Sequence, residues 1–314
     1  MIKKYQPIWI AAIAMIIVPL LLQAMGLTLT SSTDVVIFAI AAMGLNLLVG
    51  YSGLTSFGHG AWFGIGAYAA ALIQKYWFPG QIVLPFVMAV LFVALLATVV
   101  GFLILRRRGV YFSLLTLALS ALTYAIAFRW TAFTGGESGL GGVVRPALGP
   151  VNLDDPIPFL ITVSVIGLVV VYLLLRVIRS PFGHTMVAIR ENEQRATFQG
   201  YDTARYKLAM FVLSAAVTGL AGALLAFHHR FASAEPTSVA FSGELLAMVV
   251  MGGMRSFLGP ALGALFYILF REFLSIWTSN WLLWFGLAFV AFIVFSPTGL
   301  VGIWTQLKQR FKPA

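Results

Sequence analysis

The sequence predicts an all-α, polytopic integral membrane protein with about ten (eight to ten) transmembrane helices. Two observations lead to this fold class. Apolar residues make up 61% of the chain and charged residues only 10%, a composition typical of proteins whose solvent is lipid. Apolar runs near the length of about 20 residues that crosses roughly 30 Å of hydrocarbon follow one another along the chain. We therefore expect residues 1–314 to form a single membrane domain.

Charges, prolines and glycine clusters divide the apolar sequence into ten candidate segments. These segments are Ile8–Leu27, Val35–Val49, Ala61–Phe78, Ile82–Leu105, Val110–Phe128, Ile157–Val177, Leu208–Phe227, Leu245–Met251, Ala261–Leu274 and Trp281–Ile303. The second, third, eighth and ninth are short or interrupted by glycine. We expect broken or re-entrant helices among these four.

Lys and Arg residues divide unequally between the two sides of this predicted topology. With a cytosolic N-terminus, the inner connections hold 15 basic residues and the outer ones hold five. Basic residues favour the cytosolic side of a membrane, so both termini and the polar segment Ser180–Lys207 are expected in the cytosol. The net charge of +10 is then explained by topology, and we expect no nucleic-acid partner.

Cysteine and histidine give no sign of a metal or redox site. The chain has no cysteine, and its four histidines are scattered in the sequence. They are His59, His184, His228 and His229. We therefore expect neither a metal site nor a catalytic residue.

A glycine-rich stretch, GYSGLTSFGHGAWFGIG, connects two short predicted spans and predicts a broken helix. Such a break is a candidate for the wall of a translocation pathway. The residues proposed for that wall are Tyr51, Ser52, Gly53, Thr55, Phe57, His59 and Gly60. Close helix packing through Gly60 and Gly64, spaced as GxxxG, explains the same glycines equally well.

The same stretch contains Gly50–Gly53 in the form GxSG, which resembles the nucleophile motif of intramembrane serine proteases. Such an enzyme needs a histidine base beside the serine. In the predicted topology, His228 and His229 lie at the outer end of a span, whereas Ser52 lies at the inner end of another. An intramembrane protease is therefore a remote alternative.

Three other features concern the later part of the chain. Glu137, in the outer glycine-rich loop, is a candidate contact for an external partner, together with Ser138.

The adjacent residues Arg271 and Glu272 point about 100° apart on a helix, so we do not expect them to pair. Four residues echo an earlier set at an offset of 200, which suggests an internal repeat. The two sets are Gly253, Ser256, Phe257, Ala261 and Gly53, Ser56, Phe57, Ala61.

The polar segment Ser180–Lys207 holds seven of the 30 charged residues in an otherwise oily chain. Ser180 and Pro181 predict a helix start, and Gly200 predicts its end. Asp202 is placed to cap the next helix. A mixed-charge, amphipathic segment of this kind favours docking to a soluble protein over binding to lipid alone.

Several sequence blocks resemble the permease subunits of ATP-binding-cassette (ABC) importers for branched-chain amino acids. The blocks are GLNLLVGYSGLTSFGHGAWFGIGAY (Gly44–Tyr68), RRGVYFSLLTLALS (Arg107–Ser120), TGGESGL (Thr134–Leu140), Ser180–Ala226 and SPTGLVGI (Ser296–Ile303). The second and third blocks are similar to the M-type rather than the H-type member of the permease pair. The resemblance spans nearly the whole chain.

The resemblance implies a heterodimer with an H-type permease in the bacterial plasma membrane, two cytosolic ATPase subunits and an external binding protein. It identifies residues 180–207 as the ATPase-coupling loop. The family's coupling positions map onto Ala188, Arg190, Glu191, Asn192, Glu193, Ala196 and Gly200. No GK dipeptide is present, so the sequence lacks a Walker A lysine. We expect no cofactor on this chain, with ATP and Mg²⁺ bound by the partner ATPases, and a transport subunit rather than an enzyme.

Two alternative transport functions remain open. Importers of urea or short-chain amides use similar permeases, so the substrate is not fixed by the resemblance. A secondary transporter or channel would need ion-coupling carboxylates deep in its spans. The predicted spans contain almost no Asp or Glu, which counts against that class.

Overall fold

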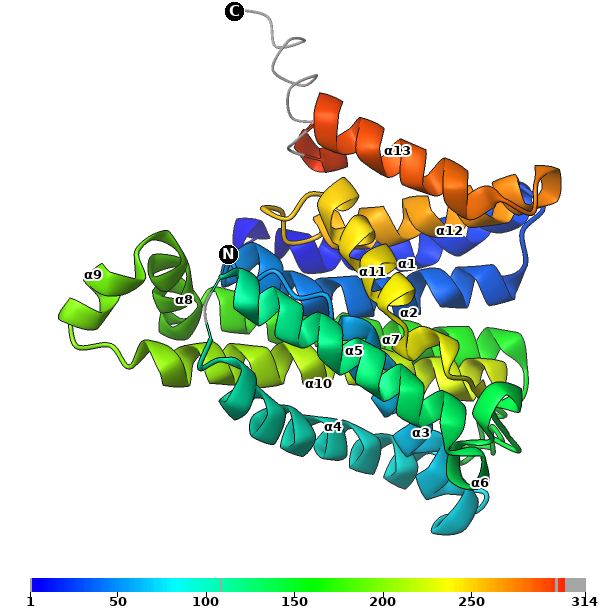
Figure 1. Ribbon diagram of the computed structural model, residues 1–314. Coiled ribbons are helices and arrows are strands. Elements are labelled where there is room, and N and C mark those ends of the chain that lie inside the picture. The colour runs from blue at the N-terminus through cyan, green and yellow to red at the C-terminus, as the bar shows by residue number, and fades with distance from the viewer. Residues whose placement is uncertain (1, 108, 297–298, 303–314) are drawn as a thin grey trace, which may run out of the picture.

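A computed structural model describes residues 2–107, 109–296 and 299–302 and confirms the all-α class (Figure 1). The longer helices are α1 (Ile2–Ala24), α2 (Leu29–Asn46), α3 (His59–Tyr76), α4 (Val83–Ile104), α5 (Val110–Arg129), α7 (Pro156–Ile178), α8 (Pro181–Glu191), α10 (Thr203–His229), α11 (Val239–Gly252), α12 (Gly259–Trp277) and α13 (Trp281–Phe295). The short elements are a π-helical turn η1 (Leu47–Tyr51), α6 (Thr131–Thr134), η2 (Gly136–Ser138), α9 (Glu193–Phe198), η3 (Glu235–Thr237), β1 (Leu140–Gly141) and β2 (Phe231–Ala232).

Seven helices in the described part of the chain are long and apolar enough to cross a membrane. They are α1, α2 with its continuation η1, α4, α5, α7, α10 and α12. The apolar helices α11 and α13 are shorter, and α3 falls outside this set. The second and ninth predicted segments are longer than expected. They correspond to α2 and α12, whose helical structure also includes residues beyond the predicted ends. The tenth helix stops at Phe295 rather than Ile303, which lies outside the described residues.

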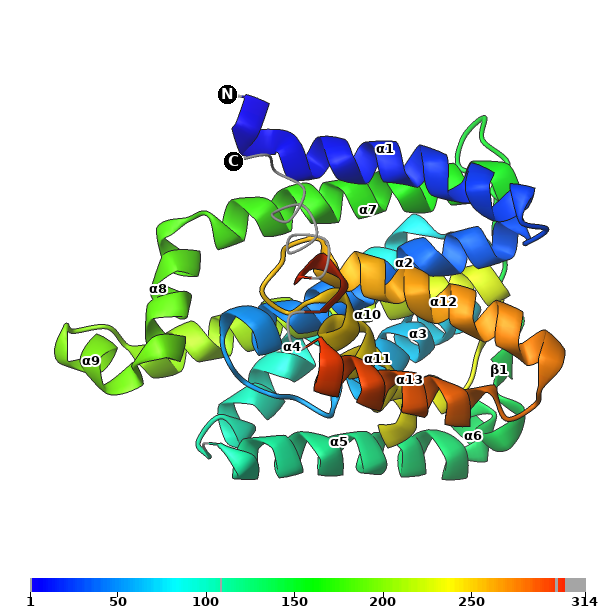
Figure 2. The same ribbon diagram turned by 90° about the horizontal axis from the view of Figure 1, so that it is seen from above.

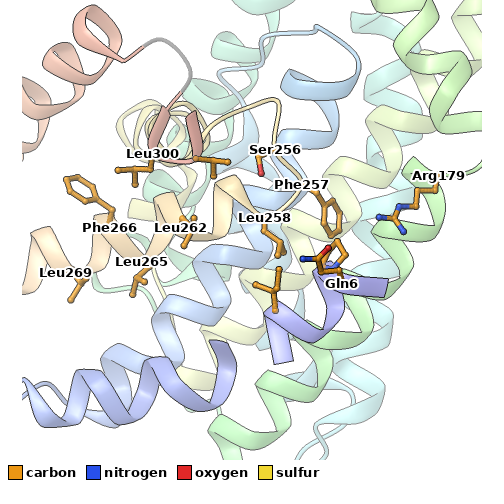
Figure 3. Close-up of a pocket in the computed structure, with 13 residues that line it drawn as sticks. Gln6, Arg179, Ser256, Phe257, Leu258, Leu262, Leu265, Phe266, Leu269 and Leu300 are labelled. Atoms are coloured by element: carbon orange, nitrogen blue, oxygen red, sulfur yellow. The ribbon is translucent and has the colours of Figure 1, made fainter. Parts of the chain in front are cut away.

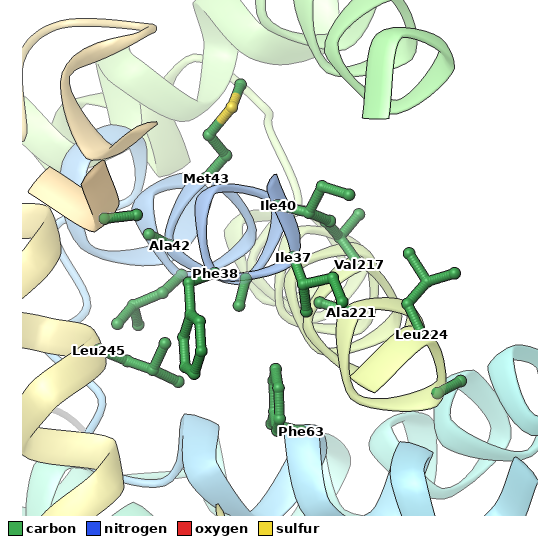
Figure 4. Packing of buried hydrophobic residues seen from close by; sticks show 14 of the residues in the cluster. Ile37, Phe38, Ile40, Ala42, Met43, Phe63, Val217, Ala221, Leu224 and Leu245 are labelled. Carbon is green, nitrogen blue, oxygen red and sulfur yellow. The ribbon is translucent and has the colours of Figure 1, made fainter. Parts of the chain in front are cut away.

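Helix α2 forms the centre of the fold. Nearly all of its apolar window is buried, whereas most of α1 is exposed. Phe38 of α2 packs beside Phe63 of α3, with ring centroids 6.0 Å apart, and Leu245 of α11 lies nearby (Figure 4). Val217 and Ala221 of α10 cover the neighbouring face of α2 (Figure 4). The exposed apolar side chains of the outer helices therefore face lipid, as expected when the solvent is hydrocarbon.

Small residues let α3 and α10 approach closely. A Cβ atom added at Gly222 of α10 would collide with the carbonyl of Phe63, and one at Gly66 of α3 would collide with the carbonyl of Gly219. Gly263 of α12 meets the carbonyl of Met248 on α11 in the same way. Close backbone approach through glycine is the usual means of helix association in membranes.

The two ends of the molecule differ. The start of α1 lies at the same end as α8 and α9, whereas α6 and β1 lie at the opposite end (Figure 2). At that opposite end β1 pairs with β2 in antiparallel register, Leu140 with Ala232. We call the α8–α9 end the inner end and the β1–β2 end the outer end, following the distribution of basic residues.

Candidate coupling and translocation site

The polar segment Ser180–Lys207 lies at the inner end and contains the helices α8 and α9, each of which begins at a side-chain N-cap. Ser180 accepts a hydrogen bond from the amide of Gly183, and Pro181 occupies the first turn of α8. The helix predicted to continue to Gly200 instead breaks at Asn192, whose side chain accepts from Arg195 N at 2.9 Å and starts α9. Asp202 caps α10, as predicted.

Glu193 fixes this segment to the membrane helices. Its carboxylate lies 2.7 Å from Lys207 Nζ and accepts a hydrogen bond from Thr203 Oγ1 at 3.3 Å, both on α10. Ala196, within α9, is buried. Ala188, Glu191, Asn192 and Gly200 are exposed at the inner end. The predicted coupling residues thus divide into two that anchor the segment and four that face solvent, with Arg190 between them.

Phe198 is a surface feature that the sequence interpretation missed. Its side chain at the end of α9 is 90% exposed. It sits among polar residues, outside the apolar helices that face lipid. An exposed aromatic side chain of this kind is a typical anchor for a protein partner. The sequence pattern that could have indicated it is a phenylalanine between polar neighbours in the predicted cytosolic loop.

The predicted broken helix is confirmed. Helix α2 ends in the π-helical turn η1, and residues 52–58 are irregular before α3 begins at His59. The hydroxyl of Ser52 donates to the carbonyl of Leu47 at 3.1 Å, and Gly53 has a positive φ of 69°. Gly53 and Thr55 are exposed, and Tyr51 and Phe57 are half-buried. Their role in a pathway stays a prediction.

His59 lies inside the protein rather than on an open wall. Its side chain is fully buried, with Nδ1 at 2.9 Å from Ser56 Oγ and Nε2 at 2.8 Å from Ser214 Oγ. Ser214 in turn donates to the carbonyl of Gly44 at 2.6 Å. The imidazole therefore joins α3, α10 and α2 at the break, because a buried polar group requires such partners.

The packing interpretation holds for the two glycines spaced as GxxxG. The amide of Gly60 donates to Ser242 Oγ at 2.9 Å, and a Cβ there would approach that oxygen to 2.6 Å. A Cβ at Gly64 would collide with the side chain of Thr237. Both positions therefore need glycine for contact with the α11 region.

A single side chain joins the inner segment to the break. Arg190 of α8 donates from Nη1 to the carbonyl of Gly50 in η1, and its Nε donates to Glu191 at 3.1 Å. A Cβ at Gly53 would lie 2.6 Å from Arg190 Cγ, so this glycine makes room for the arginine. The guanidinium also holds the pKa of the Glu191 carboxyl below its usual range. Arg190 therefore joins α8 to the end of α2 by a direct contact.

A second break lies against the first. Helix α11 ends at Gly252, residues 253–258 are irregular, and α12 starts at Gly259, repeating the arrangement of α2, residues 52–58 and α3. Gly253, like Gly53, has a positive φ. Asn46 Nδ2 donates to the carbonyl of Ser256 at 3.3 Å, which links the two breaks. The structure therefore strengthens the suggested repeat.

At the outer end, Glu137 and Ser138 are exposed in η2. They remain predicted contacts for an external partner. The expectation that Arg271 and Glu272 do not pair is wrong. Arg271 pairs with Glu272 at 3.0 Å, because the long guanidinium side chain bends back along the helix. Asp34, just before the predicted span Val35–Val49, lies inside α2 and is buried.

A groove of about 700 Å³ runs between α1 and α12 and is lined at the second break by Ser256 and Phe257 (Figure 3). Its walls include Ile10, Leu262, Leu265 and Phe266 and are almost entirely apolar, with Arg179 near one end (Figure 3). A groove of this character on a membrane helix bundle is suited to an acyl chain. It is not suited to a charged, water-soluble solute.

The protease geometry is not formed. Ser52 donates to a backbone carbonyl, while His228 and His229 lie beside Asp34, roughly 25 Å away along α2. No histidine of the described residues is hydrogen-bonded to Ser52.

A family model described as "Branched-chain amino acid transport system / permease component" matches residues 27–297. The chain belongs to this permease family. The permease is 32% identical to the high-affinity branched-chain amino acid transport system permease protein LivM of Escherichia coli K12, over 87% of this chain and 70% of the relative. It is 24% identical to a probable branched-chain amino acid transport permease protein LivH of Methanocaldococcus jannaschii, over 87% and 91% of the two chains.

A shorter match links the permease to a sugar transporter. The L-arabinose transport system permease protein AraH of Escherichia coli K12 is 34% identical over 124 residues, 39% of this chain and 35% of the relative. No solved structure is detectably similar. The permease is therefore a multi-pass membrane subunit of the ABC-importer type, and relatives with different solutes share part of its sequence.

Proposed function

We propose that this chain is the M-type permease subunit of an ABC importer for leucine, isoleucine and valine in a bacterial plasma membrane. Residues 1–314 form one permease domain, with residues 180–207 as its ATPase-coupling loop. The family match and the LivM relatives support the substrate class. The observation on which the proposal chiefly depends is the hydrogen bond from Arg190 to the carbonyl of Gly50. It connects a cytosolic docking segment to a broken helix inside the membrane.

The working complex contains an H-type permease, two cytosolic ATP-binding subunits and an external substrate-binding protein. ATP and Mg²⁺ bind to the ATPase subunits. The exposed residues Ala188, Glu191 and Asn192, with Phe198 beside them, supply the surface for an ATPase subunit. Glu137 and Ser138, exposed at the outer end, supply contacts for the binding protein.

The mechanism follows from the order of these contacts. Closure of the ATPase subunits moves α8 and α9 together with the start of α10, because only Asn192 separates the two helices and Glu193 holds α9 to Lys207 and Thr203. Arg190 passes this movement to Gly50, and the irregular residues 52–58 bend. The second break follows through Asn46 and Ser256. Tyr51, Thr55 and Phe57 then line the route that opens between this permease and its H-type partner.

The test is reconstitution of the permease with its ATPase, H-type and binding-protein partners in proteoliposomes. We expect ATP-dependent uptake of leucine, isoleucine and valine, and calorimetry of the binding protein should give the same ligands. If the complex instead takes up urea, a short-chain amide or arabinose in an ATP-dependent way, the proposed substrate class is wrong and the assignment as an ABC importer stands. Uptake without ATP, driven by an ion gradient, would overturn the proposal.

A further inference from the structure

Three potential metal ligands meet at the outer end of the helix bundle, although they are far apart in the sequence. Asp34 comes from the first turns of α2, and His228 and His229 end α10. Asp34 Oδ1 lies 3.6 Å from His228 Nε2 and 3.3 Å from His229 Nε2. One ligand atom from each residue lies within 4.8 Å of the other two. The expectation that the histidines are too scattered to act together is therefore wrong for this pair.

Contacts among the described residues leave these atoms incompletely satisfied. The His228 side chain is 6% exposed, yet neither ring nitrogen has a hydrogen-bond partner in ordinary geometry, and Asp34 Oδ1 is likewise without one. Buried polar atoms in native proteins are nearly always hydrogen-bonded or bound to water or an ion. Asp34 Oδ1 and His228 Nε2 face each other at 3.6 Å without such partners, which indicates a bound species between them.

The two separations from the Asp34 carboxylate match the ligands of one metal ion. Ligands about 2.0–2.1 Å from a tetrahedral Zn²⁺ ion stand roughly 3.3–3.4 Å from each other. The observed separations from Asp34 Oδ1 are 3.3 and 3.6 Å. Two imidazole nitrogens with one carboxylate oxygen form a set that zinc accepts, whereas Mg²⁺ and Ca²⁺ prefer oxygen ligands.

We propose that Asp34, His228 and His229 bind a divalent transition-metal ion of the Zn²⁺ class at the outer end of the permease. Three protein ligands leave a fourth position for water. His229 is the ligand through which the ion enters, since 44% of its side chain is exposed. The site joins α2 to α10 and is separate from the inner breaks and the coupling segment.

Neighbouring groups hold the ligands in place. Arg271 Nη2 lies 3.2 Å from Asp34 Oδ2, so it orients the carboxylate and leaves Oδ1 directed at the histidines. The His228 ring stacks on Phe159, with centroids 5.5 Å apart and planes 9° apart. The main chain of Thr30 lies beside the same ring, as the outer partner of a ligating histidine does. Arg271 and the nearby Arg145 place positive charge around the site, so the affinity is lower than in a site with neutral surroundings.

The test uses the full-length permease in detergent, purified through a tag without histidine and stripped with chelator. ZnCl₂ is added, and bound metal is measured after dialysis by elemental analysis, with thermal unfolding as a second readout. We expect one Zn²⁺ per chain, a higher unfolding temperature with Zn²⁺, and the visible spectrum of tetrahedral Co²⁺ after cobalt substitution. The half-exposed His229 gives the cleanest variant, because His229→Ala disturbs packing least.

Loss of a residue that only supports a metal ligand lowers metal affinity about 10- to 100-fold. His229→Ala removes a ligand itself, so we expect a larger loss of Zn²⁺ affinity. It should also abolish the zinc-dependent rise in unfolding temperature, and Asp34→Asn should do the same. The matched control is His184→Ala, which removes an exposed histidine of α8 at the inner end and should leave both readouts unchanged. Absence of Zn²⁺ from the dialysed wild-type chain, or full retention by His229→Ala, would overturn the proposal.

Discussion

Replacing Arg190 with glutamine tests whether α8 moves the broken helix directly. The change removes the guanidinium that donates to the Gly50 carbonyl and leaves most of the side-chain stem in place. A hydrogen bond with one charged partner contributes about 1.5–3 kcal/mol. Because the Arg190 side chain is 28% exposed, water weakens the bond, and the lower figure of about 1.5 kcal/mol applies.

An energy of about 1.4 kcal/mol corresponds to tenfold in an equilibrium constant. Arg190→Gln should therefore shift α8 about tenfold toward the state detached from Gly50, and uptake per ATP hydrolysed should fall by a similar factor. The assay measures both quantities in proteoliposomes that contain the complete importer. ATP hydrolysis itself should continue, because the exposed docking residues are unchanged.

A matched control separates this effect from loss of charge at the inner end. Arg205→Gln removes an arginine whose side chain is 87% exposed and pairs with the nearby Asp202. It should leave uptake per ATP unchanged. If Arg190→Gln keeps the wild-type ratio of uptake to hydrolysis, or if Arg205→Gln lowers the ratio equally, direct transmission through Gly50 is wrong.

The ion pair between Arg190 and the Glu191 carboxylate should make stability depend on pH. Arg190 holds the pKa of Glu191 below its ordinary value of 4.5. A lowered carboxyl pKa means that the stabilisation is present at neutral pH and is lost as the pH falls through that lowered pKa. Thermal unfolding of wild type and Glu191→Gln should therefore differ at pH 7 and converge below pH 4.5. A difference that grows on acidification would contradict the pairing.

Two further variants test the packing around the break. Gly222→Leu should prevent correct assembly, because the added side chain meets the Phe63 carbonyl. Overpacking costs about 1–3 kcal/mol even where the surrounding side chains can move. The control is Gly286→Leu, since a Cβ at Gly286 meets nothing within 4 Å, and it should keep the wild-type unfolding temperature. His59→Phe should lower stability by about 1–3 kcal/mol, because it removes the two hydrogen bonds of the imidazole to Ser56 and Ser214, each worth about 0.5–1.5 kcal/mol. Adding Ser214→Ala should cost less than the sum of the two single changes. Additive losses would show that the pair does not interact.

The sequence was sufficient for features that depend on local chemistry. The apolar runs predicted the helices, Ser180 and Asp202 predicted helix starts, and the glycine-rich stretch predicted the break after Tyr51. Each of these features is decided by residues within a few positions of one another. The basic residues likewise placed the α8–α9 segment at the same end as the start of α1.

Features that depend on distant partners were not predicted. The polar start of α2 resembles a loop in sequence, but Thr33 bonds to the Leu29 carbonyl and Asp34 meets Arg271, so the segment is helical and buried. The contact of Arg190 with Gly50 joins residues 140 positions apart. Spacing along the sequence contains no information on such pairs, because the packing of several helices has to bring them together.

The partners of Asp34 also impose an order on biosynthesis. His228, His229 and Arg271 are translated roughly 190 to 240 residues after Asp34, on the order of 10–50 s later at about 5–20 residues per second. Until then the carboxylate lacks these counter-ions, and a charged Asp costs about 2.5–3.5 kcal/mol at the centre of a membrane helix and less near the end, where Asp34 lies. Helix α2 is thus among the first to leave the ribosome and among the last to reach its final position. A chain truncated before α10 should leave this helix accessible to the quality-control proteases of the membrane.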